Sequence, residues 1–239
     1  MSDQRTLVIF DIDGTLLFSN SIDSQCFATT YEDRYARTFP TIDWRKFPHV
    51  VDTTIFNVAY EQDFGVLPTS EEVHAFQDAF VSLIRVERQR QPEAFQPVPG
   101  AREAVLRLLA DERYCVGIAT GGWQRPAMVK LGHVGIPTDE LWMSCADGHT
   151  TREQIIETVL RRGEAAPVSI GHTVYVGDAV WDVSTTRNLQ MPFIGLRRKG
   201  DHEVLLDIGA QVVIEDYLDY ERFLNLVAGA QPPVAVKPS

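Results

Sequence analysis

The stretch Leu7–Phe18, with the sequence LVIFDIDGTLLF, constrains the fold more than any other part of the chain. Its first four residues are all apolar, which predicts a strand buried on both faces, as in a parallel sheet. Asp11 and Asp13 follow at once, and Gly14 indicates that the chain turns there. Two carboxylates so close together need a nearby cation, or one of them must be protonated. Because open α/β sheets place ligands at the carboxyl ends of their strands, we expect a functional carboxylate pair at that edge.

The rest of the chain divides into a helical block and an alternating block. Residues 19–96 show helical periodicity without a strand signal, whereas short apolar strands alternate with helices after residue 100. Alternation of this kind predicts a doubly wound parallel sheet. The predicted fold class is therefore α/β, with a Rossmann-like core of residues 1–16 and 98–228 and an inserted all-helical cap of residues 17–97. Residues 229–239 contain three prolines and lack core residues, so we expect a flexible tail.

Charge and cysteine content narrow the possible ligands and compartments. The formal net charge of -11 argues against nucleic-acid or membrane-surface binding, since phosphate backbones select positive faces. The three cysteines, Cys26, Cys115 and Cys145, match neither a disulfide framework nor a zinc pattern. The N-terminus does not resemble a signal peptide, and no segment has the length of a membrane helix. We therefore expect a cytoplasmic monomer or homodimer with a small ligand.

Polar residues follow three of the predicted strands. They are Asp11 and Asp13, then Thr120–Gly122, then Asp178 and Asp182. In a parallel sheet these strand ends share one edge, so four carboxylates would converge there and require a cation. Mg²⁺ fits, because it binds one or two carboxylates together with waters and a substrate phosphate. The Thr120 hydroxyl and main-chain N–H groups can receive phosphate oxygens, and a carboxylate can attack phosphorus. Helix capping is the alternative role for Asp178 and Asp182.

The motifs DIDGT, TGG and GDAVWD, in this order, resemble those of the haloacid dehalogenase-like hydrolase superfamily over about residues 5–226. The helical insert after the first motif resembles the C1-type cap of its phosphoglycolate phosphatase-like and β-phosphoglucomutase-like members. The resemblance implies that Asp11 is the nucleophile and that Asp13 acts as general acid and then general base. The other implied roles are a Mg²⁺ site at Asp11, the Asp13 carbonyl, Asp178 and Asp182, and phosphoryl binding by Thr120 and Gly121.

One residue departs from the family pattern. A lysine usually precedes the last motif, but Lys46, Lys130, Lys199 and Lys237 all lie elsewhere. We expect Arg152, at a predicted helix start in DGHTTREQII, to replace it, because an arginine can bind phosphate bidentately. The alternative is an ordinary solvated arginine. Lys130 is the competing cation, and its position in a predicted helix favours a surface role.

The two aspartates of the first motif also narrow the expected reaction. Dehalogenases and phosphonate-cleaving enzymes of this superfamily lack the second aspartate, so Asp13 argues against both. We expect a phosphatase that hydrolyses a small phosphorylated metabolite through an aspartyl phosphate on Asp11. A sugar phosphomutase and a non-catalytic phosphate-binding protein are the alternatives.

Substrate contacts are expected from the cap, which excludes water from such sites. The candidates are Phe18, Ser19, Asn20 and Asp23, just after the first motif, and the loop of residues 49–54, which contains His49, Asp52 and Thr53. Asp52 and Thr53 have an alternative role as caps of the next helix, and His49 as an exposed loop residue. None of these residues distinguishes phosphoglycolate from a sugar phosphate or a nucleotide.

Overall fold

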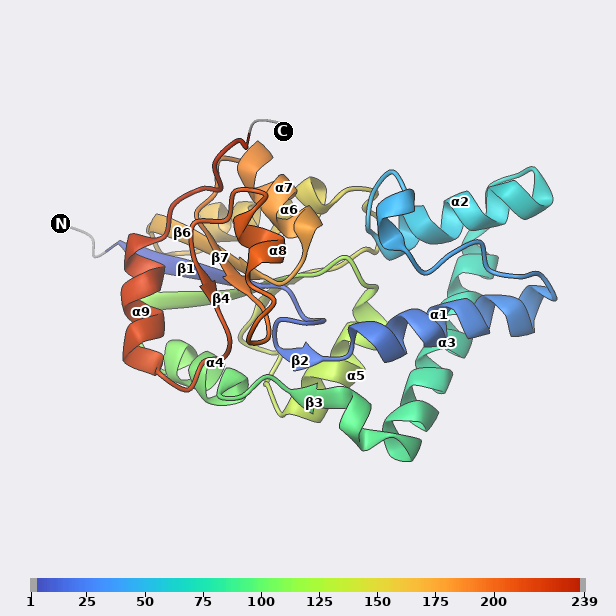
Figure 1. The fold of residues 1–239 in the computed structure, drawn as a ribbon, viewed down its shortest axis with the longest axis horizontal. Coiled ribbons are helices and arrows are strands. Elements are labelled where there is room, and N and C mark those ends of the chain that lie inside the picture. The colour runs from blue at the N-terminus through green and yellow to red at the C-terminus, as the bar shows by residue number, and fades with distance from the viewer. Residues whose placement is uncertain (1–3, 237–239) are drawn as a thin grey trace.

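The computed structural model describes residues 4–236; the first three residues of the predicted core and the last three of the predicted tail lie outside the described residues. An α/β core and a helical cap lie side by side (Figure 1). The core contains a six-stranded parallel sheet in the order β5-β4-β1-β6-β7-β8. Its strands are β1 Arg5–Phe10, β4 Tyr114–Ala119, β5 Trp142–Ser144, β6 Ile170–Gly177, β7 Phe193–Leu196 and β8 Val213–Ile214. The predicted α/β class with a Rossmann-like core is confirmed.

Strand β1 occupies the middle of the sheet and is covered on both faces. Its residues Leu7 to Phe10 are at most 1% exposed, and Ile9 pairs with Gly117 on one side and Tyr175 on the other. Helices α6 and α7 cover one face, and α4, α5 and α9 lie on the other side (Figure 1). These helices are α4 Ala101–Leu109, α5 Gln124–Val134, α6 Arg152–Ala165, α7 Val180–Asn188 and α9 Tyr220–Gly229, with a short α8 at Glu203–Leu206. Charged groups on β1 can therefore reach a ligand only beyond its carboxyl end.

The cap is built from α1, α2 and α3, as the helical periodicity predicts. These helices span Asn20–Tyr35, Asp52–Phe64 and Ser70–Arg90, and the short 3-10 helices η1 and η2 span Trp44–Lys46 and Pro92–Phe95. The expected absence of strands is wrong at one point, because β2 Leu17–Phe18 pairs antiparallel with β3 Gln96–Pro97. Two-residue strands are too short to give a periodic signal. These two strands pair the segment in which the chain leaves the core for the cap with the segment in which it returns.

The cap packs directly against the core around Trp123. This side chain is 1% exposed and stacks on Phe27 of α1, with ring centroids 5.8 Å apart. Its indole N–H donates to the Thr53 hydroxyl over 3.0 Å, and that hydroxyl donates to the Ala146 carbonyl over 2.7 Å. One hydrophobic cluster accordingly runs through both parts. The domain boundaries that we drew at residues 16–17 and 97–98 stay predictions.

The segment after α9 differs from the expected flexible tail. Ala230 is 4% exposed, and the Phe193 N–H of β7 donates to the Gln231 carbonyl over 3.1 Å. The Val234 N–H donates to the Gly209 carbonyl over 2.8 Å. Its prolines lack N–H groups, but the carbonyls of the segment still accept hydrogen bonds from the core. Residues 230–236 therefore lie along the core in an ordered path.

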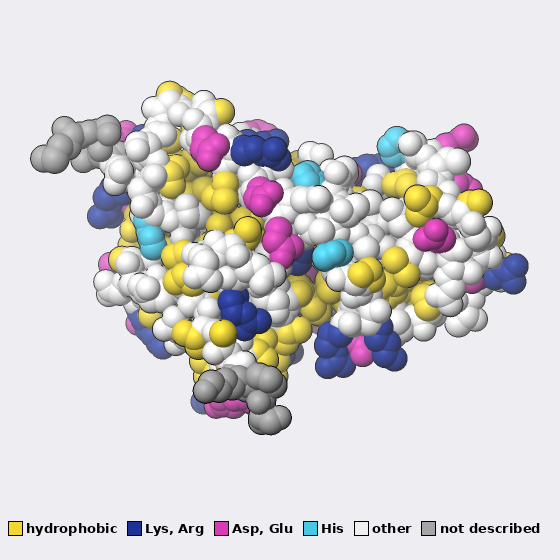
Figure 2. All heavy atoms as spheres, turned by 90° about the horizontal axis from the view of Figure 1, so that it is seen from above, with side chains coloured by type: hydrophobic (Ala, Val, Ile, Leu, Met, Phe, Trp, Pro, Cys, Tyr) yellow, Lys and Arg dark blue, Asp and Glu magenta, His cyan; other side chains and the backbone are white. Residues whose placement is uncertain are grey.

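The surface carries both signs of charge. On the face seen from above, acidic and basic side chains of the described residues are interspersed (Figure 2). Within residues 4–236, none of the helices combines the length and the apolar character that crossing a membrane requires.

Candidate active site

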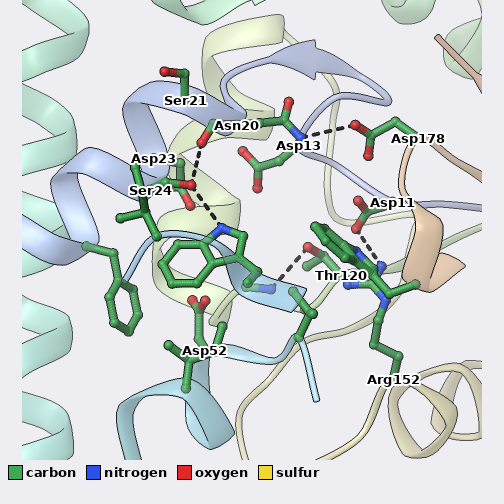
Figure 3. A pocket seen from close by; sticks show the side chains of 18 residues that line it. Asp11, Asp13, Asn20, Ser21, Asp23, Ser24, Asp52, Thr120, Arg152 and Asp178 are labelled. Carbon is green, nitrogen blue, oxygen red and sulfur yellow. Dashed lines mark hydrogen bonds and ion pairs between the residues drawn. The ribbon is translucent and has the colours of Figure 1, made fainter. Parts of the chain in front are cut away.

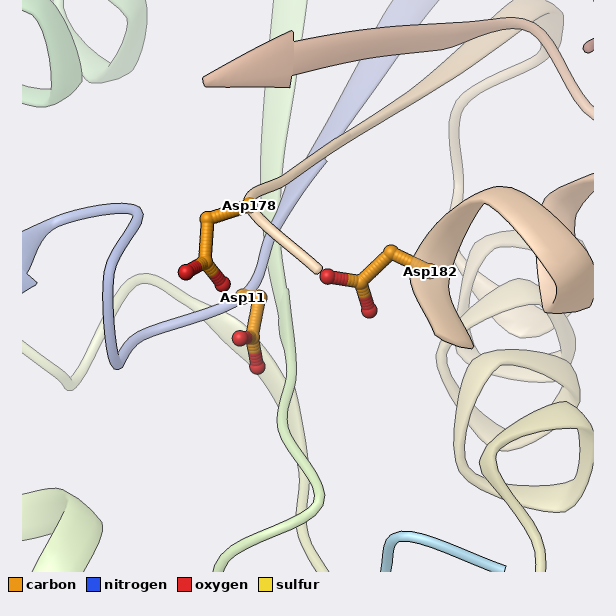
Figure 4. A group of neighbouring side chains, drawn as sticks. All are labelled: Asp11, Asp178 and Asp182. Carbon is orange, nitrogen blue, oxygen red and sulfur yellow. The ribbon is translucent and has the colours of Figure 1, made fainter. Parts of the chain in front are cut away.

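Three buried carboxylates meet at the carboxyl edge of the sheet. Asp11 follows β1, Asp178 follows β6, and Asp182 lies in the first turn of α7 (Figure 4). Each offers an oxygen within 4.8 Å of the others. The parallel arrangement of β1 and β6 places these residues side by side although 167 positions separate Asp11 from Asp178 in the chain. The convergence expected from the strand ends is present.

Two of these carboxylates have an oxygen without a hydrogen bond. The Oδ1 atoms of Asp11 and Asp178 are buried and meet no hydrogen-bond geometry with the described residues, although Asp11 Oδ1 forms an ion pair with Arg152. Burial raises the pKa of Asp11 to about 7; Arg152 opposes this shift and Asp182 adds to it. Burial, followed by the charges of Asp182 and Asp11, raises the pKa of Asp178 well above its usual value. A hard cation would stabilise both charged forms, so these residues fit Mg²⁺.

Arg152 supplies positive charge beside Asp11. It is the first residue of α6, whose start is fixed by a capping box between Thr151 and Gln154. Its Nη2 lies 3.2 Å from Asp11 Oδ1 and 2.7 Å from Asp182 Oδ1. The side chain is only 7% exposed, so the alternative of a solvated arginine is wrong.

Asp182 has both oxygens engaged within the core. Its Oδ1 accepts from Arg152, and its Oδ2 accepts from the Ala179 N–H over 3.0 Å. The Tyr175 hydroxyl also accepts a hydrogen bond from Arg152 over 2.8 Å, and the sequence analysis did not identify this residue. The capping role considered for Asp182 is present together with its role in holding Arg152.

The loop after β4 brings main chain close to the same arginine. Thr120 is 3% exposed, and its hydroxyl accepts from the Gly122 N–H over 3.3 Å. A Cβ atom at Gly121 would lie 2.5 Å from Arg152 Nη1 and 2.6 Å from the Val50 carbonyl oxygen. Only glycine fits there without displacing Arg152 or the cap. The loop thus places a hydroxyl and main-chain groups between Arg152 and the cap.

Lys130 is buried, and the expectation of a surface role is wrong. Its Nζ lies 2.6 Å from Asp13 Oδ2 and 2.5 Å from Asp23 Oδ1, and the residue is 2% exposed. The sequence does carry a signal for this, because Lys130 shares the buried face of α5 with Ala127 and Val134. The lysine therefore joins the core at Asp13 to the cap at Asp23.

The charge states of this second cluster follow from its surroundings. Burial lowers the pKa of Lys130, but the carboxylates of Asp13 and Asp23 outweigh that effect and raise it overall. Burial raises the pKa of Asp23 to about 6, against the opposing effect of Lys130. The Ser19 hydroxyl donates a hydrogen bond to Asp13 Oδ1, so both oxygens of Asp13 are held.

The candidate cap residues have different positions. Asn20 donates from Nδ2 to Asp178 Oδ2 over 3.1 Å and lines the cavity between core and cap (Figure 3). Ser19 is instead buried against Asp13. Thr53 holds the cap to the core through Ala146. His49 is exposed and lines a different depression from the one at Asp11.

Asp52 does not cap the helix that it begins. The N-cap of α2 is Val51, and the Asp52 Oδ2 instead accepts from the Trp123 N–H at the start of α5 over 3.0 Å. The same carboxylate lines the main cavity. The expected alternative, in which Asp52 caps α2, is therefore wrong. The Asp52 carboxylate instead accepts from a main-chain N–H at the start of α5, which is a helix of the core.

A cavity of about 400 Å³ lies between core and cap. Its core side contains Asp11, Asp13, Thr120, Arg152 and Asp178, and its cap side contains Asp23, Ser24, Phe27, Trp44, Asp52 and Ile55. Asp23 is one of the candidates expected just after the first motif, whereas no motif in the sequence marks Trp44. The predicted phosphate-binding residues and the predicted carboxylates other than Asp182 thus share one cavity with residues of the cap.

Comparisons with known proteins agree with this arrangement. The model of the family "Haloacid dehalogenase-like hydrolase" matches residues 8–196. A phosphoglycolate phosphatase of Agrobacterium fabrum (strain C58 / ATCC 33970) is 22% identical over 214 residues, which cover 88% of each chain. A hydrolase from Pseudomonas syringae has a TM-score of 0.69 at 20% identity, over 93% of this chain and 99% of that one. The β-phosphoglucomutase of Clostridium difficile has a TM-score of 0.65 at 15% identity, over 96% and 98%. These structures share the fold.

Proposed function

Since the chain belongs to the haloacid dehalogenase-like hydrolase family, we propose that it is a Mg²⁺-dependent phosphomonoester hydrolase that works through an aspartyl phosphate on Asp11. Its substrate would be a small phosphorylated metabolite. The observation that carries the proposal is the placement of Asp11 at the cavity, 3.2 Å from the Arg152 guanidinium and within the cluster that includes Asp178.

The metal would be held by the Asp13 carbonyl and by the carboxylates of Asp11 and Asp178, of which Asp178 Oδ1 is buried without a hydrogen bond among the described residues. When bound, Mg²⁺ supplies positive charge that stabilises the carboxylates and the transferring phosphoryl group. Asp182 would support the site through Arg152, because both of its oxygens are already engaged. The donor set consists of oxygens, as a hard cation requires.

The protein's own groups divide the reaction between them. A carboxylate oxygen of Asp11 attacks phosphorus as the ester P–O bond breaks, and Asp13 donates a proton to the leaving oxygen. Asp13 then accepts a proton from the water that attacks the phosphoenzyme, which releases inorganic phosphate and restores Asp11. Arg152, Thr120 and Gly121 bind the phosphoryl oxygens. Lys130 and Ser19 hold the Asp13 side chain beside the cavity.

Turnover of p-nitrophenyl phosphate and a panel of phosphometabolites, with Mg²⁺ and with chelator, tests the proposal. We expect hydrolysis that depends on Mg²⁺, and a loss of at least about 10³-fold in the Asp11→Asn variant. Asp139→Asn, at an exposed site, is the matched control. Full activity in Asp11→Asn contradicts the nucleophile assignment. Conversion of one sugar phosphate to another favours a mutase, and ligand binding without turnover favours a non-catalytic protein.

We also propose a reducing cytoplasmic location. Cys26, Cys115 and Cys145 are free thiols in the structure, which supports that proposal. The expected monomer or homodimer stays a prediction, and sedimentation of the purified protein tests it.

A further inference from the structure

Carboxyl groups line both sides of the cavity between core and cap, whereas the arginine among the described lining residues, Arg152, lies on the core side. Asp11, Asp178 and Arg152 lie on one side, and Asp23 and Asp52 lie on the opposite side, nearer the cap (Figure 3). If phosphoryl chemistry takes place at Asp11, the cap side faces the leaving group. The composition of that side therefore determines which phosphate esters the cavity accepts.

No free cation of the lining faces the leaving group. Arg152 is the cation among the described residues that line the cavity, and it is already bound to Asp11, Asp182 and the Tyr175 hydroxyl. Lys130 has a side chain only 3% exposed, and both of its carboxylate partners lie within 2.6 Å. A negatively charged leaving group would meet the carboxyl group of Asp52 on the cap side, and the described cations nearby are already paired with other carboxylates.

Asp52 is placed to contact the leaving group. Its Oδ2 accepts from the Trp123 N–H, and a Cβ atom at Gly122 would lie 3.7 Å from that oxygen. The carboxyl group therefore stands over the loop that carries Thr120, the expected phosphoryl-binding residue. Carboxyl oxygens in this position accept hydrogen bonds from hydroxyl or ammonium groups.

The remaining cap-side surface is largely apolar. Phe27 is 1% exposed over the whole residue but lines the cavity, together with Trp44 and Ile55. The Trp44 indole N–H is already used, because it donates to the Ser24 hydroxyl over 2.9 Å. Phe27, Trp44 and Ile55 suit the C–H groups of a leaving group, and the polar side chains of Asn20 and Ser21 line the cavity beside them.

We propose that the leaving group donates hydrogen bonds to the cap-side carboxyl groups and carries no negative charge. The substrate class is thus a phosphomonoester of a hydroxyl-bearing or ammonium-bearing alcohol, and esters with a carboxylate near the phosphate, such as phosphoglycolate, are poor substrates. This inference rests on the proposed function, and it names the substrate class of that same site.

Three esters of matched size test it: 2-hydroxyethyl phosphate, phosphoethanolamine and phosphoglycolate, whose leaving groups are neutral, positive and negative. We expect kcat/KM for phosphoglycolate to be at least about tenfold below that for 2-hydroxyethyl phosphate, because the carboxyl oxygens of Asp52 can accept a hydrogen bond from a hydroxyl group but not from a carboxylate. If kcat/KM for phosphoethanolamine exceeds that for 2-hydroxyethyl phosphate, the preferred leaving group carries an ammonium group. If it is lower, the preferred leaving group carries hydroxyl groups. Both results support the proposal. Phosphoglycolate at an equal or higher kcat/KM overturns it.

A matched pair of variants assigns the discrimination to Asp52. Asp52→Asn keeps an oxygen for the Trp123 N–H, and we expect it to reduce the selectivity against phosphoglycolate at least about threefold. Asp147→Asn is the control, because Asp147 Oδ2 accepts from the neighbouring Gln124 N–H over 2.6 Å but does not line the cavity. If the selectivity against phosphoglycolate changes equally in the two variants, or does not change in Asp52→Asn, the role of Asp52 is contradicted.

The same assays separate this inference from the proposed function. If p-nitrophenyl phosphate is hydrolysed while the three esters react equally well, the substrate class is wrong and the hydrolase stands. If no phosphate ester is hydrolysed in the presence of Mg²⁺, the proposed function is wrong and the inference falls with it.

Discussion

The two buried cations Arg152 and Lys130 contact different parts of the molecule. Arg152 contacts Asp11, Asp182 and Tyr175, all of which belong to the α/β core. Lys130 contacts Asp13 in the core and Asp23 in the cap. Each cation balances two carboxylates, but only the second joins the two parts of the chain.

The difference separates two tasks at the proposed site. Arg152, beside the proposed nucleophile Asp11, is held by helix α6 and strand β6, and the partners of Arg152 do not involve the cap. The group beside the proposed acid and base, Asp13, depends on where helix α1 of the cap places Asp23. We infer that phosphoryl binding is a property of the core, whereas proton transfer depends on core and cap together.

Removal of Arg152 gives the largest expected effect. Arg152→Ala should lower kcat/KM about 10²–10³-fold for p-nitrophenyl phosphate and for 2-hydroxyethyl phosphate alike, because it removes charge that stabilises the phosphoryl group in both. Steady-state kinetics checks this, with Arg161→Ala, an exposed residue of the same helix, as the control. An effect confined to one of the two esters contradicts a role in phosphoryl binding.

Removal of Lys130 should act more selectively. Lys130→Met should lower kcat about 10–100-fold for 2-hydroxyethyl phosphate and much less for p-nitrophenyl phosphate, whose leaving group needs little protonation. It should also lower the free energy of unfolding by about 3 kcal/mol, because Asp13 and Asp23 lose their shared partner.

Kinetics with both esters and denaturant unfolding check these expectations for Lys130. Lys46→Met, at an exposed lysine of the cap, is the control. Equal losses on both esters would show that Lys130 serves the fold or the phosphoryl group and not Asp13.

The smallest expected effect is on stability as a function of pH. In the folded protein without metal, burial raises the pKa of Asp11 to about 7 from 3.8. The folded state therefore holds a proton that the unfolded chain releases, and the contribution of Asp11 to stability falls as the pH rises from about 4 to 7. We expect this loss to reach about 1–3 kcal/mol in chelator and to shrink with Mg²⁺.

Urea unfolding at several pH values, in chelator, measures this dependence. The Asp11→Asn variant cannot release that proton, so its stability should vary less over the same range. An identical pH dependence in the variant and the parent would assign the effect to other groups.

The fold and the carboxylate cluster could be read from the sequence because local patterns encode them. The apolar run before Asp11 specifies a buried strand, and the parallel sheet then brings Asp178 to the same edge. Arg152 could be proposed because a helix start precedes the last motif at a suitable distance. In each case one short segment carries the information.

The contacts of the cap could not be read in the same way. Lys130 looked like a surface residue because its partners Asp13 and Asp23 lie more than 100 positions away. Asp52 looked like a cap of its own helix, but its acceptor role depends on how the cap meets the start of α5. The position of Lys130 on an apolar face was the one local sign, and it indicates burial without naming a partner.

The most direct test of the account asks which residue carries the phosphoryl group. The enzyme is mixed with substrate and Mg²⁺, quenched in acid within one turnover, and reduced with borohydride, which converts a phosphorylated aspartate to homoserine. Peptide mass spectrometry then locates the reduced residue. The account predicts reduction at Asp11 alone, and none in Asp11→Asn. Reduction at another carboxylate, or product formation in a burst without any reduced residue, would contradict it.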